Sequence, residues 1–137
     1  EACIEGLRDG TIDCIATDHA PHAIQDKLCE FDAAACGISG LETAFGLALT
    51  ALPLEDTVCA LTIGPVRALG LDRRIDGLGT LTVGAPGDVV IIDPEAEWTV
   101  EPEAFASKGK NTPLAGRTLH GRVVATIFGG RIAFDGR

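Results

Sequence analysis

Residues 12–22 read Ile12-Asp13-Cys14-Ile15-Ala16-Thr17-Asp18-His19-Ala20-Pro21-His22. The apolar run at the start of this stretch predicts a short buried strand over residues 12–17, which ends just before Asp18. Residues 1–9 carry apolar side chains near helical spacing, and Gly10 follows them as a helix stop signal. A helix followed closely by a short buried strand is typical of parallel α/β architecture.

The segment after this stretch predicts a loop and then helices. Residues 19–37 are polar and contain a proline, and loops of that length in compact domains are usually functional. Ser39-Gly40-Leu41-Glu42 fits a capping box, in which the serine and glutamate side chains each satisfy a free backbone N–H. We therefore expect a helix over residues 39–51, a second over 54–63 and a short helical turn over 66–69.

The character of the sequence changes near Gly77, after which glycines, prolines and β-branched residues dominate. Strands are expected at residues 89–92 and 98–100. Gly129-Gly130 suits a tight turn, so a hairpin is expected from residues 122–128 and 131–134. The chain thus divides into an α/β half and an all-β half.

Composition excludes several classes of protein. Hydrophobic residues make up 46% of the 137 residues, which is enough for a packed core and argues against disorder. The net charge of −9 disfavours nucleic acid and anionic membrane surfaces as partners, and the apolar runs are too short to span a bilayer. The five cysteines are odd in number and show no CxxC spacing. We therefore expect a cytoplasmic protein with free thiols, buried or partly buried.

The densest cluster of chemically useful side chains is the Asp18–His22 loop. In a parallel α/β barrel the C-terminal ends of strands display catalytic groups, and a carboxylate there can ligate a metal or carry a proton. His22 can bind a substrate carboxylate when protonated, or donate a hydrogen bond. A metal pair of His19 and His22 would lack the third protein ligand that zinc needs. Taken alone, an Asp-His pair at a strand end is more often only a loop cap than catalytic, and His120 is interpreted as a surface or packing residue.

Residues 12–22 also resemble the signature of the dihydroorotases, which belong to the amidohydrolase superfamily. The resemblance is collinear over nearly the whole chain, and it continues through Glu30-Phe31-Asp32 and residues 37–44, 79–88, 111–116 and 121–130. It implies an α/β fold: the C-terminal end of a TIM-type (β/α)8 metal-dependent hydrolase barrel, with strands of a small composite β-sandwich. The barrel part would be residues 1–72 and the sandwich part residues 73–137.

The resemblance also implies a role for each site residue. Asp18 matches an aspartate that ligates one metal of a binuclear zinc site and shuttles a proton. His22 matches the histidine that holds the substrate carboxylate, and the backbone at Cys36 and Gly37 matches a segment that hydrogen-bonds the pyrimidine ring. The implied reaction is reversible cyclisation of N-carbamoyl-L-aspartate to dihydroorotate, in pyrimidine biosynthesis. The other metal ligands would lie upstream, in an N-terminal part of the same protein, so the chain is expected to be inactive alone.

Two departures and three alternatives accompany this interpretation. Many family members have Ala-Pro-Phe-Gly at residues 34–37 and Asn-Pro-Ala-Arg at residues 64–67, where this chain differs; the second site predicts a helix that starts at Pro65. The chain could instead belong to a non-catalytic dihydroorotase-like partner of aspartate transcarbamoylase. It could belong to another cyclic amidohydrolase, such as a dihydropyrimidinase or allantoinase, or be a binding module. A homodimer, or association with aspartate transcarbamoylase, would also be compatible with the family.

Overall fold

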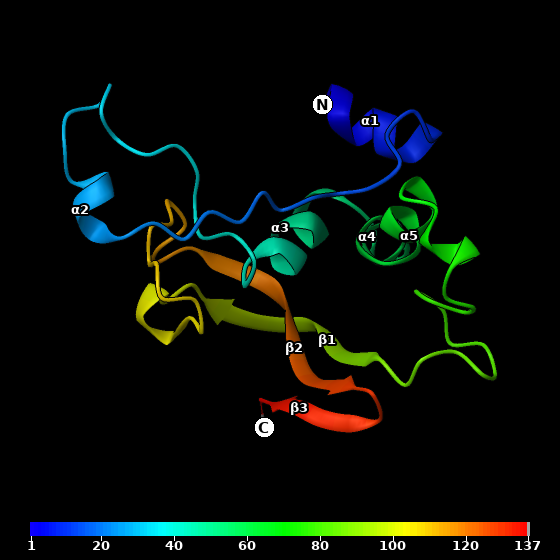
Figure 1. The fold of residues 1–137 in the computed structure, drawn as a ribbon. Coiled ribbons are helices and arrows are strands. Elements are labelled where there is room, and N and C mark those ends of the chain that lie inside the picture. Colours follow the sequence, from blue (N-terminus) through cyan, green and yellow to red (C-terminus); the bar gives the residue numbers. More distant parts are fainter. Residues whose placement is uncertain (137) are drawn as a thin grey trace.

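The computed structural model describes residues 1–136, in which helices come first and an antiparallel sheet follows (Figure 1). The helices are α1 (Ala2–Asp9), α2 (Ile24–Lys27), α3 (Ala44–Ala51), α4 (Leu54–Leu61) and α5 (Ile63–Ala68). The strands are β1 (Val89–Thr99), β2 (Thr118–Phe128) and β3 (Arg131–Asp135). Two 3-10 turns, η1 (Leu71–Arg73) and η2 (Pro102–Ala104), lie in the connections.

The sheet has the order β1-β2-β3 with both pairs antiparallel. The two strands expected at residues 89–92 and 98–100 are one long strand, β1, whose register with β2 shifts between Asp93 and Glu97. Pro94 lies in this irregular part, and it has no N–H to give to a ladder. The predicted hairpin is confirmed: Gly129 and Gly130 join β2 to β3 with φ values of 56° and 75°, as a tight hairpin turn requires.

The main core lies where α3 and the connection between β1 and β2 cover the sheet (Figure 1). It contains four buried apolar side chains, with Leu47 of α3 and Trp98 of β1 packed against them. These four are Val100, Phe105, Leu114 and Leu119. The indole of Trp98 donates a hydrogen bond to the carbonyl of Gly121, with a distance of 2.9 Å. The all-β half is therefore packed against a helix of the α/β half.

Several predicted helix boundaries were wrong. The helix expected over residues 39–51 begins at Ala44, because the side chains of Ser39 and Glu42 bond to the segment 107–111 and cap no helix. The helix expected over 54–63 ends at Leu61, and α5 covers most of the turn expected over 66–69. Pro65 therefore lies within the first turn of α5 and does not start it, a place where its missing N–H has no cost.

The strand predicted over residues 12–17 is not formed within the described residues. The segment runs as an extended coil from α1 towards α2 (Figure 1), and the N–H of Ile15 bonds to the carbonyl of Ala60 in α4. A strand needs ladder partners beside it, and the partners here are a single parallel bridge between His19 and Ile38. The predicted loop over 19–37 also contains the short helix α2.

Other expectations concern cysteines and membranes. All five cysteines are free, as predicted, but Cys3, Cys29, Cys36 and Cys59 are exposed and only Cys14 is partly buried. Their predicted burial was thus wrong for four of the five, because these residues fall in surface loops or on outer helix faces. In the described part of the chain, none of the helices is both long and apolar enough to cross a bilayer.

Candidate active site

Asp18 has an unusual backbone conformation and a free carboxylate. It lies at φ 44°, and among residues 1–136 it alone of the non-glycine residues has a positive φ. This conformation costs energy for an L-residue, and such strain is often found at functional sites. The side chain is exposed, and no other residue of 1–136 hydrogen-bonds its carboxylate. It is therefore available to bind a ligand or carry a proton.

His22 and Cys36, which the sequence placed in one substrate site, are in direct contact. The Nε2 atom of His22 lies 2.9 Å from the carbonyl oxygen of Cys36. A carbonyl only accepts, so Nε2 must carry a proton and donate. If the ring is also to donate to a carboxylate through Nδ1, it must be the imidazolium cation. The structure thus brings these two predicted residues together while leaving the second ring nitrogen unused by this bond.

Gly37 occupies a position that only glycine fits. Its φ is 111°, and a Cβ built there would lie 2.5 Å from the Cβ of Ala20. This close approach follows from the bridge beside it, in which the N–H of Ala20 donates to the carbonyl of Ile38 at 2.8 Å. The carbonyl of Gly37 accepts from the ammonium group of Lys27 at 3.1 Å. Asp18, His22, Cys36 and Gly37 therefore belong to two segments that lie side by side.

Asn111, which sequence analysis did not single out as a site residue, joins these two segments. Its amide nitrogen donates to the carbonyls of Ala20 (3.0 Å) and Gly37 (3.2 Å). Its amide oxygen accepts from the backbone N–H of His22 (2.9 Å), and the hydroxyl oxygen of Ser39 lies 3.0 Å from it while donating its one proton to the carbonyl of Gly109 at 2.6 Å. Asn111 reads locally as a turn residue before Thr112-Pro113, and its partners are 72 to 91 residues away, so no local pattern identifies it.

His19 forms a second link to the same part of the chain. Its Nδ1 accepts from the N–H groups of Gly40 (3.2 Å) and Leu41 (3.1 Å), so the proton of a neutral ring lies on Nε2. Nε2 lies 3.1 Å from the hydroxyl of Ser107, whose own N–H donates to a Glu42 carboxylate oxygen at 2.9 Å. His19 is thus a structural residue, and no metal pair with His22 is formed.

Asp18 fits a metal as one ligand. Zinc accepts carboxylate oxygens, and the carboxylate of Asp18 is exposed and unused. Within residues 1–136, no group of three or more His, Cys, Asp or Glu side chains is placed to hold a metal ion. A metal at Asp18 would therefore take its other protein ligands from outside the described residues.

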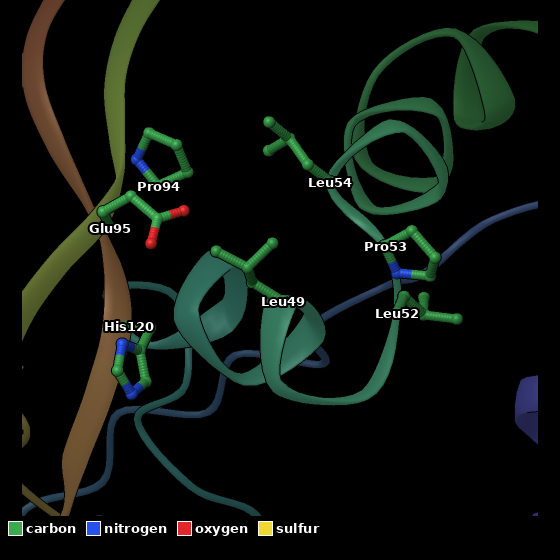
Figure 2. Close-up of a pocket in the computed structure, with 7 residues that line it drawn as sticks. All are labelled: Leu49, Leu52, Pro53, Leu54, Pro94, Glu95 and His120. Atoms are coloured by element: carbon green, nitrogen blue, oxygen red, sulfur yellow. The ribbon is translucent and has the colours of Figure 1, made fainter.

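Two hollows on the surface lie away from the predicted site residues. Figure 2 shows one of about 360 Å³, where Leu49 of α3 and the Leu52–Leu54 turn face Pro94, Glu95 and His120 on the sheet. A larger one of about 720 Å³ lies between Glu42, Phe45 and Trp98. Neither is lined by Asp18, His22, Cys36 or Gly37. His120 is 53% exposed and lies 3.6 Å from the Glu97 carboxylate, which agrees with its interpretation as a surface residue.

Comparison with known proteins gives the family. A model of the amidohydrolase family matches residues 2–134. The chain belongs to the amidohydrolase family. The dihydroorotase of Anaeromyxobacter sp. (strain K) is 55% identical over 139 residues, covering 98% of this chain and 31% of that protein. The dihydroorotase of Syntrophus aciditrophicus is 46% identical over 140 residues, covering 98% of this chain and 32% of that protein. The resemblance to dihydroorotases is thereby confirmed.

Solved structures of amidohydrolase-family enzymes share the fold. The D-hydantoinase (dihydropyrimidinase) from Thermus sp. superimposes with a TM-score of 0.85 at 25% identity, covering 98% of this chain and 31% of that one. The L-hydantoinase (dihydropyrimidinase) from Arthrobacter aurescens gives 0.85 at 29% identity, covering 97% and 31%. The chain thus has an α/β amidohydrolase fold and spans about a third of the length of the relatives it matches.

Proposed function

We propose that this chain is part of a dihydroorotase, which interconverts N-carbamoyl-L-aspartate and dihydroorotate. The observation that carries the proposal is the contact between His22 and Cys36, which joins the two segments expected to hold the substrate, one of which also carries the strained, unpaired Asp18. The identity of about half to relatives named dihydroorotase supports the same reaction. The parts expected from the resemblance, a TIM-type barrel over 1–72 and β-sandwich strands over 73–137, remain part of the proposal.

Each site residue has a proposed role. Asp18 would hold zinc through its carboxylate and would exchange a proton with the substrate nitrogen. A cationic His22 holds the substrate carboxylate through Nδ1, while its Nε2–H is held by Cys36. The backbone of Cys36 and Gly37 faces the ring of the substrate. When bound, zinc supplies Lewis acidity that polarises the amide carbonyl, and its remaining protein ligands lie outside residues 1–136.

A second candidate is a dihydropyrimidinase-type enzyme, because the hydantoinase structures superimpose over nearly the whole chain. The two candidates differ in the substrate: dihydroorotate carries a carboxylate and dihydrouracil does not. A cationic His22 stabilises the former and has no partner in the latter.

The test uses the complete protein that contains this chain, loaded with zinc. Hydrolysis of dihydroorotate and dihydrouracil is measured for the wild type, Asp18→Asn and Asp13→Asn. Asparagine tolerates positive φ, so Asp18→Asn removes the charge without disturbing the backbone. We expect activity on dihydroorotate, a loss of at least about a hundredfold in Asp18→Asn, and little change in the exposed control Asp13→Asn. A folded, zinc-loaded wild type that hydrolyses only dihydrouracil would favour the second candidate, and one that hydrolyses neither would contradict both.

A further inference from the structure

We propose that Asn111 is a positioning residue that sets the affinity of the site for its substrate. It would do so by holding the loop of Asp18 and His22 against the segment of Cys36 and Gly37. This inference rests on the proposed function, because it assumes that these two segments bind the substrate. Asn111 makes no hydrogen bond to the carboxylate of Asp18 or the ring of His22; its bonds in the described residues go to the backbone of the two segments.

The hydrogen-bond partners of the Asn111 side chain determine which end of its amide group is the nitrogen and which is the oxygen. Two carbonyls, those of Ala20 and Gly37, face one end, and a carbonyl can only accept, so this end is the NH₂ group. The backbone N–H of His22 faces the other end and can only donate, so this end is the oxygen. Both amide protons are donated, and the oxygen accepts from the N–H of His22. Among the side chains, only the amides of asparagine and the longer glutamine offer two N–H donors and an acceptor oxygen in one plane.

The backbone around Asn111 is fixed as firmly as its side chain. Its own carbonyl accepts from the N–H of Ser39 at 2.8 Å. Ser39 is fully buried, and its hydroxyl donates to the carbonyl of Gly109 at 2.6 Å. Gly109 packs so closely on Pro21 that an added Cβ would lie 2.6 Å from the Pro21 carbonyl carbon. The amide is therefore held in place before any substrate arrives.

The consequence for binding follows from what the amide holds. Bonds to Ala20 and His22 fix one segment, and the bond to Gly37 fixes the other, so the side chain lies behind both proposed substrate contacts. Without it, the segments keep the His22–Cys36 contact, the Ala20–Ile38 hydrogen bond, the bonds from Gly40 and Leu41 to His19, and the bond from Lys27 to Gly37. None of these bonds fixes the backbone N–H of His22. The segments should then separate more often, and the substrate would have to restore their register when it binds. That cost falls on KM more than on kcat.

The experiment compares Asn111→Ala and Asn111→Asp in the complete, zinc-loaded protein. Asn111→Asp keeps the oxygen that accepts from His22 but loses both donors and sets a carboxylate against two carbonyls. Thr112→Val is the matched control, because it removes one hydroxyl that accepts from Leu114 at 3.3 Å in the same loop. We expect about a tenfold or larger rise in KM for dihydroorotate in both Asn111 variants, a kcat within about threefold, and wild-type values in the control. A KM unchanged in Asn111→Ala would overturn the inference and leave the dihydroorotase proposal standing.

A second readout does not depend on activity. Amide hydrogen exchange over residues 18–22 should become about tenfold faster in Asn111→Ala, because the N–H of His22 loses its acceptor. The same peptide in Thr112→Val should exchange as in the wild type. If the wild type proved inactive, the proposed function would fail, yet faster exchange would still support the tether and unchanged exchange would overturn it. A general loss of folding would appear as faster exchange in α4 and β2 as well, and it would count against a positioning role.

Discussion

Two residues with rare backbone conformations flank the bridge between His19 and Ile38. Asp18 precedes the bridge at φ 44°, and Gly37 precedes its other side at φ 111°. Glycine meets no steric penalty at such an angle, whereas aspartate does. Of these two residues, only Asp18 is therefore strained, and its carboxylate has no hydrogen-bond partner among residues 1–136. A sequence pattern predicts that Asp18 follows an apolar run, but it does not predict a positive φ, and the residues just after Asp18 are held by bonds from His19 and Ala20 to residues 38–41.

Glu42 should make stability depend on pH. Burial, the largest single influence, acts to raise the pKa of its carboxyl group, but hydrogen bonds led by those from Ser107 together hold the pKa below its ordinary value of 4.5. Smaller lowering of the Glu42 pKa comes from its own backbone N–H and from the charge of His19. Because the folded pKa is lowered, the stabilisation is present above 4.5 and is lost as pH falls through the folded value.

The measurement is the free energy of unfolding of the wild type and Glu42→Gln from pH 7 to pH 3. We expect Glu42→Gln to be less stable at pH 7, with a gap that narrows once the pH falls below 4.5. The exposed Glu103 gives a matched control, and Glu103→Gln should follow the wild-type curve. A gap that stays constant across this range would show that the glutamate contributes through shape alone.

At the scale of elements, local signals were predictable and long-range ones were not. Gly10 ends α1 at φ 81° and the Gly129-Gly130 pair turns the hairpin, since both features depend only on neighbouring residues. Ser39 and Glu42 satisfied the local rule for a capping box and were nevertheless used elsewhere, by partners 65 to 72 residues away. The apolar run before Asp18 has no ladder partners within the described residues, so the strand that its sequence pattern predicts is not formed there.

The contact between α3 and β2 depends on a glycine in the helix. A Cβ at Gly46 would lie 3.0 Å from the carbonyl oxygen of His120 and 3.2 Å from the Cβ of Leu119. Helix propensity alone predicts that Gly46→Ala stabilises by about 1 kcal/mol. Because the added methyl group has no room against backbone, we expect a net loss of about 1–3 kcal/mol, measured by denaturant unfolding. Thr50→Ala, at an exposed position of the same helix, should change stability by less than about 0.5 kcal/mol, and a stabilised Gly46→Ala would contradict the packing.

At the scale of the whole molecule, hydrogen bonds around the proposed site join the α/β half and the all-β half that the sequence predicts. Asn111 and Ser107 come from the connection between β1 and β2, and they bond to His22, Glu42 and the segment before α3. Helix α3 in turn covers β2 (Figure 1). The division at residues 72 and 73 stays a prediction, and the proposed site would draw on residues from both sides of it. Sequence analysis found the Asp18–His22 loop because its residues are adjacent, and it missed the residue that holds the loop from the other half.

The described residues do not hold a complete set of metal ligands, and this gives a prediction about zinc binding. A catalytic zinc takes about three protein ligands, and within residues 1–136 only Asp18 is proposed as one, with no group of three candidates assembled. After dialysis against metal-free buffer, the isolated 137-residue chain should retain far less than one zinc per molecule, measured by elemental analysis. The complete protein should retain zinc, and less of it in Asp18→Asn than in Asp13→Asn, because only the first substitution removes a ligand. Stoichiometric zinc in the isolated chain, unaffected by Asp18→Asn, would show that the metal is held by other residues and that Asp18 has a different role.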